Sequence, residues 1–367
     1  MKFSCSRQEL SDALGSVTRA VAPKSTHPAM EGVLMRTTER GLFLCCYNME
    51  MGISTEIEAR VSEDGDVVLN ARLFADMVRR FSSETVEITS DDKCMTSVRG
   101  GAAEFSIIGI PAEEFPPLPE ADGREVIPVK EETLRSMIDQ TLYAVAVNDF
   151  KPVHTGSKFI FEDGTLSLVS VDGFRLAIRK EPVSYTGELS FIVPGKTLAE
   201  VSRLCDGDDD AQLCVSQRQI VFRVGDYSII SRLLEGDFID FRSSIPQTAG
   251  TVVTVSVRDT LSSVERTSLL ISDRLKSPIR FSVGDGEIRI SCATALGKVN
   301  DTVACESKGA PVEMGFNNRY LMEALRATDC DKVRMEITGP LSPVKIVPLE
   351  GDSFLFLVLP VRMKTDI

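Results

Sequence analysis

Two patterns of hydrophobic and polar residues alternate along this chain. Short stretches place apolar residues three or four positions apart, which predicts amphipathic helices, and the stretches between them alternate apolar with polar residues, which predicts β-strands. The helical spacing is clear at Leu10, Leu14, Val17 and Val21, and again at Leu134, Ile138, Thr141 and Val145. Helices are predicted over residues 8–21, 71–81, 131–146, 196–204, 258–270 and 317–326. Strand-helix-strand units of this kind predict an α+β protein with few helices and long antiparallel sheets.

The whole pattern occurs three times. The stretch FSCSRQELSDALGSVTRAV matches VKEETLRSMIDQTLYAV without a gap, so that Leu134 lies 124 residues after Leu10. A third copy, VSVRDTLSSVERTSLL, places Leu261 127 residues after Leu134. A period this long indicates repeated domains, because solenoid units run about 20 to 50 residues.

Segments rich in Pro and Gly mark the ends of the copies. GIPAEEFPPLP closes the first copy and LLEGDFIDFRSSIP closes the second, which predicts linkers near residues 121–125 and 247–251. We therefore expect three domains, at 1–124, 125–249 and 250–367. About 122 residues per domain is enough to bury a core without disulfides or metals.

Composition narrows the class of protein. The chain is 43% apolar, has no Trp, and holds nine Cys with no C-x-x-C pair, so we expect a reduced cytoplasmic protein with no structural metal and no cofactor. The first residues lack the apolar run of a signal peptide. The longest apolar run, residues 354–361, is too short to span a bilayer, and it predicts a buried strand.

Charge is distributed unevenly. The net charge is −13, but the six predicted helices carry 11 basic and 10 acidic residues, so the strands and loops hold the acidity. An acidic chain repels nucleic acid unless its cations are gathered on one surface. The predicted helices are the place where such a gathering is expected, since they carry Arg19, Arg72, Arg79, Arg80, Lys196, Arg203, Arg266, Arg319 and Arg326, with Lys24 just after the first helix. Charge alone leaves two interpretations, solvated helix faces and a surface for phosphates.

The sequence gives little support for catalysis. It has two histidines, His27 and His154, and none of the H-E-x-x-H, G-x-S-x-G, Walker or G-x-G-x-x-G motifs. The acidic run at residues 206–210 has two interpretations, a solvated turn and a site for a divalent cation, and the first is favoured because the ligand order of a calcium loop is missing.

Three motifs carry a resemblance to a known family. SVDGFRLAIRK at 170–180, LLEGDFIDFRSSIP at 233–246 and FLVLPVRM at 356–363 resemble the bacterial β sliding clamps, the processivity subunits of DNA polymerase III. The resemblance covers the whole chain. It implies three DNA-clamp domains per chain and two chains joined head to tail in a ring, with helices lining the hole, antiparallel sheets outside and duplex DNA threaded through without sequence specificity. It also implies a non-catalytic homodimer whose partners are the replicative polymerase, the clamp loader, other polymerases and repair proteins, with no membrane association.

The same resemblance implies a cleft that binds a short partner peptide between the second and third domains. Its predicted residues, which we call the candidate cleft, are His154, Val171, Gly173, Phe174, Arg175, Leu176, Ile239, Ser243, Ser244, Leu357, Leu359, Val358, Pro360, Val361, Arg362 and Met363. Apolar walls at Leu176, Val358, Pro360 and Met363 would bury the anchors of the peptide, and Arg175 and Arg362 would hold its polar groups. By pattern alone, the favoured interpretation of DGFRLAI and FLVLP is that they are core strands, and the resemblance reverses this preference in favour of the cleft. His154, Ile239, Ser243 and the extension 364–367 depart from the family pattern.

Two further surfaces follow from the resemblance. The DNA-binding positions are Arg19, Lys24, Arg72, Arg79, Arg80, Asn148, Lys151, Lys196, Arg203, Arg266 and Arg319, and Gly195 stands where a basic residue is usual. At the dimer interface, the strand edge near Phe105 and Ile107 would pair with the edge near residues 298–304, and Leu270 and Ile271 would pack alongside.

Two readings from other classes remain. A clamp-like scaffold would gather partners without serving replication, and its helix cations would be dispensable. An enzyme would need an unrecognised carboxylate site, for which residues 206–210 are the candidate.

Overall fold

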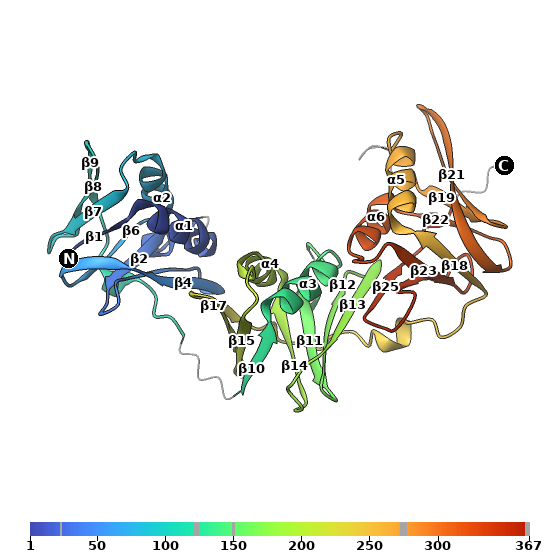
Figure 1. Cartoon of the computed structure of the whole chain (residues 1–367), viewed down its shortest axis with the longest axis horizontal. Helices are drawn as coiled ribbons and strands as arrows, with labels where there is room; N and C mark the ends of the chain where they lie inside the picture. The colour runs from blue at the N-terminus through green and yellow to red at the C-terminus, as the bar shows by residue number, and fades with distance from the viewer. Residues whose placement is uncertain (23, 120–124, 149–150, 272–276, 364–367) are drawn as a thin grey trace. The chain divides into compact units, whose positions relative to one another are not determined.

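The computed structural model describes residues 1–22, 24–119, 125–148, 151–271 and 277–363, and it confirms the α+β class (Figure 1). Five of the α-helices of the described chain begin directly after a strand, and α6 begins one residue after β22 (Val312–Phe316). The helices are α1 (Arg7–Val17), α2 (Ala71–Arg80), α3 (Glu131–Leu142), α4 (Gly195–Leu204), α5 (Val257–Ser268) and α6 (Asn318–Arg326). The residue before the helix often caps it, since the side chains of Ser6, Asn70, Ser256 and Asn317 each accept a hydrogen bond from a backbone N–H of the first turn.

Two helices end earlier than their apolar spacing predicts. α1 stops at Val17 and gives way to the 3-10 turn η1 (Thr18–Ala20), so Val21 lies outside the helix. α3 stops at Leu142, where Ala144 N–H bonds to Thr141 O in a tighter turn and leaves Val145 outside. Val21 is buried from the following loop, and Val145 is half-buried, so the apolar spacing continues past the end of each helix.

The first 134 residues form a compact unit with residues 199–233. This unit contains a five-stranded antiparallel sheet and an eight-stranded one, with α1 and α2 packed against each other and α1 against β3 and β4. The five-stranded sheet has the order β5 (Ala59–Glu63), β1 (Lys2–Ser6), β7 (Thr85–Ser90), β8 (Met95–Gly100) and β9 (Ala103–Ile108). The eight-stranded sheet has the order β10 (Glu125–Lys130), β15 (Asp210–Val215), β16 (Gln219–Val224), β17 (Tyr227–Arg232), β4 (Met51–Ile57), β3 (Leu42–Tyr47), β2 (Gly32–Thr37) and β6 (Asp66–Asn70).

Residues 135–198 and 234–367 form the second unit, which holds one 12-stranded antiparallel sheet. Phe281, Phe316, Phe354 and Phe356 fill the core between this sheet and the helices α5 and α6. The strand order is β14 (Leu189–Pro194), β11 (Gly156–Glu162), β12 (Thr165–Val171), β13 (Arg175–Pro182), β25 (Phe354–Val358), β24 (Val344–Val347), β23 (Lys332–Ile337), β18 (Thr251–Ser256), β21 (Gly297–Gly309), β20 (Glu287–Thr294), β19 (Ile279–Val283) and β22 (Val312–Phe316).

The two units divide the central repeat between them. The reason is strand pairing: β17 of the central repeat pairs with β4 of the first repeat, and β13 pairs with β25 of the third. Each half of the central repeat therefore continues the sheet of a neighbouring repeat, which the sequence pattern did not predict.

The strand predicted over residues 354–361 is shorter than expected. β25 ends at Val358, because Leu359 N–H turns to bond with Phe174 O and Val361 N–H bonds with Gly315 O of β22. Leu359 and Val361 are 37% and 41% exposed, so the end of the apolar run lies at the surface. No helix of the described residues is long and apolar enough to cross a membrane.

The cysteines are free thiols, mostly buried in the sheets. Burial raises the pKa of Cys45 to about 12, and burial together with the charge of Glu9 does the same for Cys5. These thiols stay protonated at neutral pH, which makes them poor nucleophiles and poor metal ligands.

Candidate binding cleft, charged helix surface and open strand edges

The candidate cleft has an apolar floor on one face of the 12-stranded sheet. On paired strands, Leu176 of β13 stands opposite Leu357 of β25, and Ile178 stands opposite Leu355. We call this side of the sheet the cleft face. Its buried cluster consists of Val169, Val171, Leu176, Ile178 and Leu357, with Ile160, Phe238, Phe241, Ile245 and Leu355 packed against it. Three of the predicted cleft residues, Val171, Leu176 and Leu357, thus come together at the floor.

One predicted wall residue faces the other way. Val358 belongs to the core beneath α5 and α6, whereas its neighbour Leu357 belongs to the cleft face. Successive side chains of a strand point to opposite faces, so only one of the two can line the candidate cleft. The assignment of Val358 as an apolar wall is therefore wrong, and Leu357 takes that place.

The rim of the candidate cleft exposes large apolar side chains. Phe174 is 57% exposed, Ile239 44%, Val361 41% and Leu359 37%. Phe174 follows Gly173, whose φ of +84° lies in the left-handed region, and this sharp turn presents the Phe174 ring at the surface. Exposed apolar groups that gather beside an apolar floor are typical of a binding surface.

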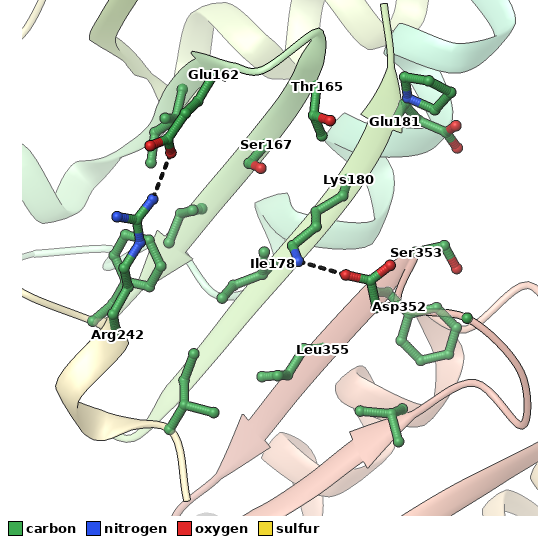
Figure 2. A pocket seen from close by; sticks show the side chains of 18 of the residues that line it. Glu162, Thr165, Ser167, Ile178, Lys180, Glu181, Arg242, Asp352, Ser353 and Leu355 are labelled. Atoms are coloured by element: carbon green, nitrogen blue, oxygen red, sulfur yellow. Dashed lines mark hydrogen bonds and ion pairs between the residues drawn. The ribbon is translucent and has the colours of Figure 1, made fainter. Parts of the chain in front are cut away.

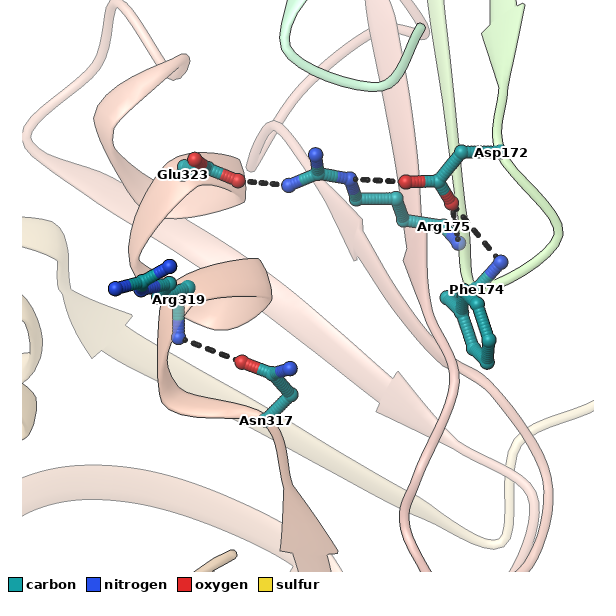
Figure 3. A network of polar contacts seen from close by, with 6 residues as sticks. All are labelled: Asp172, Phe174, Arg175, Asn317, Arg319 and Glu323. Atoms are coloured by element: carbon teal, nitrogen blue, oxygen red, sulfur yellow. Dashed lines mark hydrogen bonds and ion pairs between the residues drawn. The ribbon is translucent and has the colours of Figure 1, made fainter. Parts of the chain in front are cut away.

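Arg175 is tied into a polar network (Figure 3). Its Nε donates to Asp172 Oδ2 at 2.9 Å, its Nη1 donates to Glu323 of α6, and its guanidinium lies 4.5 Å from the centre of the Tyr320 ring. The Arg175 side chain is only 9% exposed. With both carboxylates bound, the guanidinium holds the loop of the second repeat against α6 of the third, so its predicted role in holding peptide groups falls to the exposed Arg362.

The aromatic residues of this network extend it to the rim. The Phe174 ring stacks on Tyr320 with centroids 5.8 Å apart, and the Arg175 guanidinium also lies 5.4 Å from the centre of the Tyr143 ring. Burial raises the pKa of Tyr143, against the opposing effect of the Arg175 charge. Tyr143, Tyr320 and Glu323 were not among the predicted residues, although Tyr320 and Glu323 are three residues apart on one helix face.

The remaining cleft residues lie at its borders. His154 packs edge-on against Phe238, with ring centres 6.0 Å apart. Ser243 and Ser244 are exposed in the short 3-10 helix η5 (Arg242–Ser244). Pro360 is half-buried, and Met363 packs against Gly315, where an added Cβ would lie 2.7 Å from Met363 Cγ. The extension 364–367 lies outside the described residues.

The predicted DNA-binding residues are all exposed, and several of their arginines already have carboxylate partners. Arg19 and Arg203 both contact Glu200, at 3.6 and 3.4 Å. The other pairs in this set are Arg79 and Arg80 with Asp76, and Arg266 with Asp301. Arg326, a helix arginine outside the set, pairs with Glu265. Burial opposes ionisation of Asp301, but hydrogen bonds from Arg266 and Ser263 outweigh it and hold the pKa of that carboxyl below its usual value.

The other predicted DNA-binding positions are Lys24, Arg72, Asn148, Lys151, Lys196 and Arg319, all exposed. Gly195 is buried at the start of α4, where a Cβ would lie 3.0 Å from Val145 Cγ1 and 3.2 Å from Thr155 O. A basic side chain would crowd these neighbours, which explains its absence.

Two strands present open edges. β9 is the last strand of its sheet, with Phe105 40% and Ile108 75% exposed and Ile107 half-buried. β21 pairs with β20 through residues 297–304, but it pairs with β18 only through residues 305–309. The N-terminal half of β21 therefore leaves one side of its backbone open within the described chain.

The apolar residues after α5 are arranged differently from the prediction. Leu269 is 82% exposed, Leu270 is half-buried, and Ile271 packs against the core of the third repeat. Because Ile271 faces its own core, Leu269 and Leu270 are the residues free to contact another chain.

The acidic run near Asp206 is bound into the surrounding structure. Asp210 pairs with Lys130 across β10 and β15 at 3.0 Å, and Gly207 N–H donates to Glu131. Among the residues described, no three or more His, Cys, Asp or Glu side chains gather as a metal site.

Comparison with known proteins matches this arrangement of three repeats. Residues 1–119, 128–240 and 242–362 match, in turn, the N-terminal, central and C-terminal domain families of the DNA polymerase III beta subunit. The beta sliding clamp of Staphylococcus epidermidis is 29% identical over 99% of both chains. The crystal structure of the DNA polymerase sliding clamp from Bacillus subtilis is 27% identical, with a TM-score of 0.95 over 99% of this chain and 100% of that one.

Fold, repeats and matches together define a sliding clamp of three domains. The chain belongs to the family of bacterial DNA polymerase III beta subunits. Its function is that of a processivity clamp for DNA polymerase, and the alternative of a scaffold unrelated to replication is not favoured.

Proposed function

We propose that two copies of this chain join head to tail as a closed ring around duplex DNA and tether a polymerase through the candidate cleft. The ring is non-catalytic and works in the cytoplasm, and each copy contributes three domains, at 1–124, 125–249 and 250–367. The observation that carries the proposal is the pair of open strand edges, one in the first repeat and one in the third.

The two edges suit each other as a head-to-tail contact. β9 exposes the apolar side chains of Phe105 and Ile108, and residues 297–304 of β21 lack a partner on one side. An exposed apolar edge strand invites pairing with another chain. Since the two edges belong to different repeats, the contact is heterologous, and such contacts close into a ring when the rotation allows it.

The candidate cleft supports the tethering of partners. Replicative polymerase, clamp loader, other polymerases and repair proteins would each present a short peptide with apolar anchors to Leu176, Leu357 and the exposed rim. Each apolar side chain buried there contributes about 1.5 to 3 kcal/mol. The partner peptide adds affinity at one small site, so different proteins can exchange on the same ring.

The charged helices support non-specific contact with DNA. Contacts to phosphates hold a protein on DNA without reading its sequence. Arginines that already pair with Asp or Glu release few counterions, so the ring would be held by its closure more than by adhesion.

The test combines mass in solution with retention on DNA. The wild-type chain should have about twice the mass of 40.2 kDa, stay on circular DNA after loading and leave linear ends. Ile108→Asp should yield a monomer that is not retained on circles, because a carboxylate would be buried at the edge. Val126→Asp, a charge at another exposed strand residue (54% exposed), is the matched control and should keep the dimer. A wild-type monomer, or equal retention on linear and circular DNA, would contradict the proposal.

A further inference from the structure

A groove of about 760 Å³ lies on the cleft face, outside the candidate cleft (Figure 2). It runs across β12, β13 and β25, and η5 with the residues after it borders one side. Val169, Ile178 and Leu355 form its floor, and Thr165, Ser167 and Lys180 continue it along the strands. None of these residues belongs to the predicted binding set.

The groove continues the candidate cleft in register. Leu176 and Leu357, at the floor of the candidate cleft, are followed two residues along the same strands by the pair Ile178 and Leu355. Side chains two residues apart share a face and lie about 6.8 Å from each other. A peptide that crosses the candidate cleft in extended form would therefore reach this groove within a few residues.

Residues 239–245 border both the candidate cleft and the groove. Ile239, Ser243 and Ser244 belong to the candidate cleft, while Phe241, Arg242 and Ile245 line the groove. Phe241 and Ile245 pack on the same apolar cluster as Leu176. One continuous apolar strip thus connects the two places.

Beyond the apolar floor, the groove is flanked by two ion pairs, which Figure 2 shows on opposite sides. Arg242 Nη2 lies 2.8 Å from Glu162 Oε2, and Lys180 Nζ lies 2.7 Å from Asp352 Oδ2. The hydrogen bond and charge of Lys180 hold the pKa of Asp352 below its usual value. Asp352 is 84% exposed and Arg242 65%, so both pairs can rearrange towards a ligand at low cost.

This chemistry favours a peptide over a small charged ligand. Besides the two pairs, the groove is lined by the cations of Arg334 and Lys345 and the carboxylates of Asp163 and Glu181. Cations and carboxylates are therefore equal in number, which leaves no excess charge to hold an isolated anion or cation. An apolar strip with polar groups on both sides instead suits an extended chain, whose backbone N–H and C=O groups need partners and whose alternate side chains need an apolar surface.

We propose that this groove binds the residues that flank the clamp-binding motif of a partner protein. An apolar side chain of the flank packs over Ile178 and Leu355, and a polar residue follows beside Lys180 and Asp352. The inference rests on the proposed peptide-binding role of the candidate cleft and adds a second site that distinguishes partners with matching flanks from partners with the motif alone.

The experiment compares two synthetic peptides from the replicative polymerase of the same host, measured by calorimetry. The short one holds the clamp-binding motif alone, and the long one adds about six residues on each side, which is enough to cover the groove. We expect the full-length wild-type chain to bind the long peptide about tenfold more tightly, a difference of about 1.4 kcal/mol.

Two variants test whether the extra affinity for the long peptide comes from contacts in the groove. Ser167→Arg fills the groove from β12, and Lys180→Glu replaces a cation of the exposed pair. Each should reduce the affinity for the long peptide to that for the short one and leave the short peptide unaffected. Ser228→Arg, the same substitution at a half-buried serine of β17, is the matched control and should change neither affinity.

The outcomes separate the two proposals. Equal affinity of the wild type for both peptides, or a tenfold difference that survives both groove variants, overturns the groove. Failure of both peptides to bind the wild type overturns the candidate cleft, and the groove with it. If Ser167→Arg does not fold by circular dichroism, Lys180→Glu at the exposed pair decides the question.

Discussion

The candidate cleft and the charged helix surface use their exposed side chains in opposite ways. At the candidate cleft, Phe174, Ile239 and Leu359 expose apolar surface beside a buried apolar floor. On the helices, several of the predicted DNA-binding arginines are paired with carboxylates of the same chain, as Arg19 and Arg203 are with Glu200. The apolar side chains of the candidate cleft are exposed to a ligand, whereas the positive charge of the helix surface is already partly neutralised. This difference suits a sliding clamp, because partner proteins must bind firmly at the cleft while contacts with DNA must stay weak enough to allow sliding.

The largest effect is expected from a charge introduced at the apolar rim of the candidate cleft. Leu359→Asp places a carboxylate at the rim where a peptide anchor would pack, and we expect peptide affinity to fall by about 10- to 100-fold. DNA retention should not change. Calorimetry with a clamp-binding peptide measures the effect, and Val126→Asp, on β10, serves as control. Wild-type affinity in Leu359→Asp would show that the exposed rim does not contact the peptide.

A smaller effect is expected from the polar network that positions the rim. Glu323→Gln removes one of the two carboxylates of Arg175 without changing shape, which frees the loop that carries Phe174. We expect the Kd for the peptide to rise about fivefold, which is less than the loss of a direct charge-assisted hydrogen bond would give, because Glu323 acts on the peptide only through Arg175.

Two further variants show whether Glu323 acts by positioning Arg175 and the loop that carries Phe174. Arg175→Lys should weaken peptide binding like Glu323→Gln, since lysine cannot bridge two carboxylates in the same geometry. Glu265→Gln, which breaks the surface pair with Arg326, is the control and should leave the Kd unchanged. If Glu323→Gln also leaves it unchanged, the network stabilises the fold only.

A third substitution tests whether the paired arginines of the helix surface contact DNA. Glu200→Gln releases Arg19 and Arg203 together, so binding to a short duplex should become more salt-dependent, with the slope of log K against log salt steeper by up to about 2 units. Fluorescence anisotropy at several salt concentrations measures it. Glu9→Gln removes the same charge from α1 at a residue with no arginine pair among the described contacts. An unchanged slope in Glu200→Gln would mean that these arginines do not face DNA.

The smallest effect concerns pH. Because the pKa of Asp301 is lowered, its pairing with Arg266 stabilises the fold above the usual pKa of Asp, about 3.9, and the stabilisation is lost as pH falls through the lowered value. The Tm of the wild type should exceed that of Asp301→Asn by a constant amount between about pH 5 and about pH 8. Below about pH 4 the difference should shrink. The exposed Asp92→Asn is the control, and a difference that persists at low pH would contradict the assignment.

The sequence predicted those features that depend on local periodicity. Six helices and three repeats follow from spacing within the chain, and helix ends at Val17 and Leu142 were missed because a turn, not the apolar spacing, decides them. Partners distant in the chain were not predictable from local pattern. Arg175 meets Glu323 148 residues away, and the choice between Leu357 and Val358 depends on which face of β25 meets the helices.

The pairing of β13 with β25 has a consequence for how the chain unfolds. Backbone hydrogen bonds join half of the central repeat to the third repeat in one sheet, as β17 and β4 join the other half to the first. The cooperative units that open in hydrogen exchange should therefore follow the sheets and not the repeats. The repeats are similar in length, but we expect the segments that unfold together to span the boundaries between them.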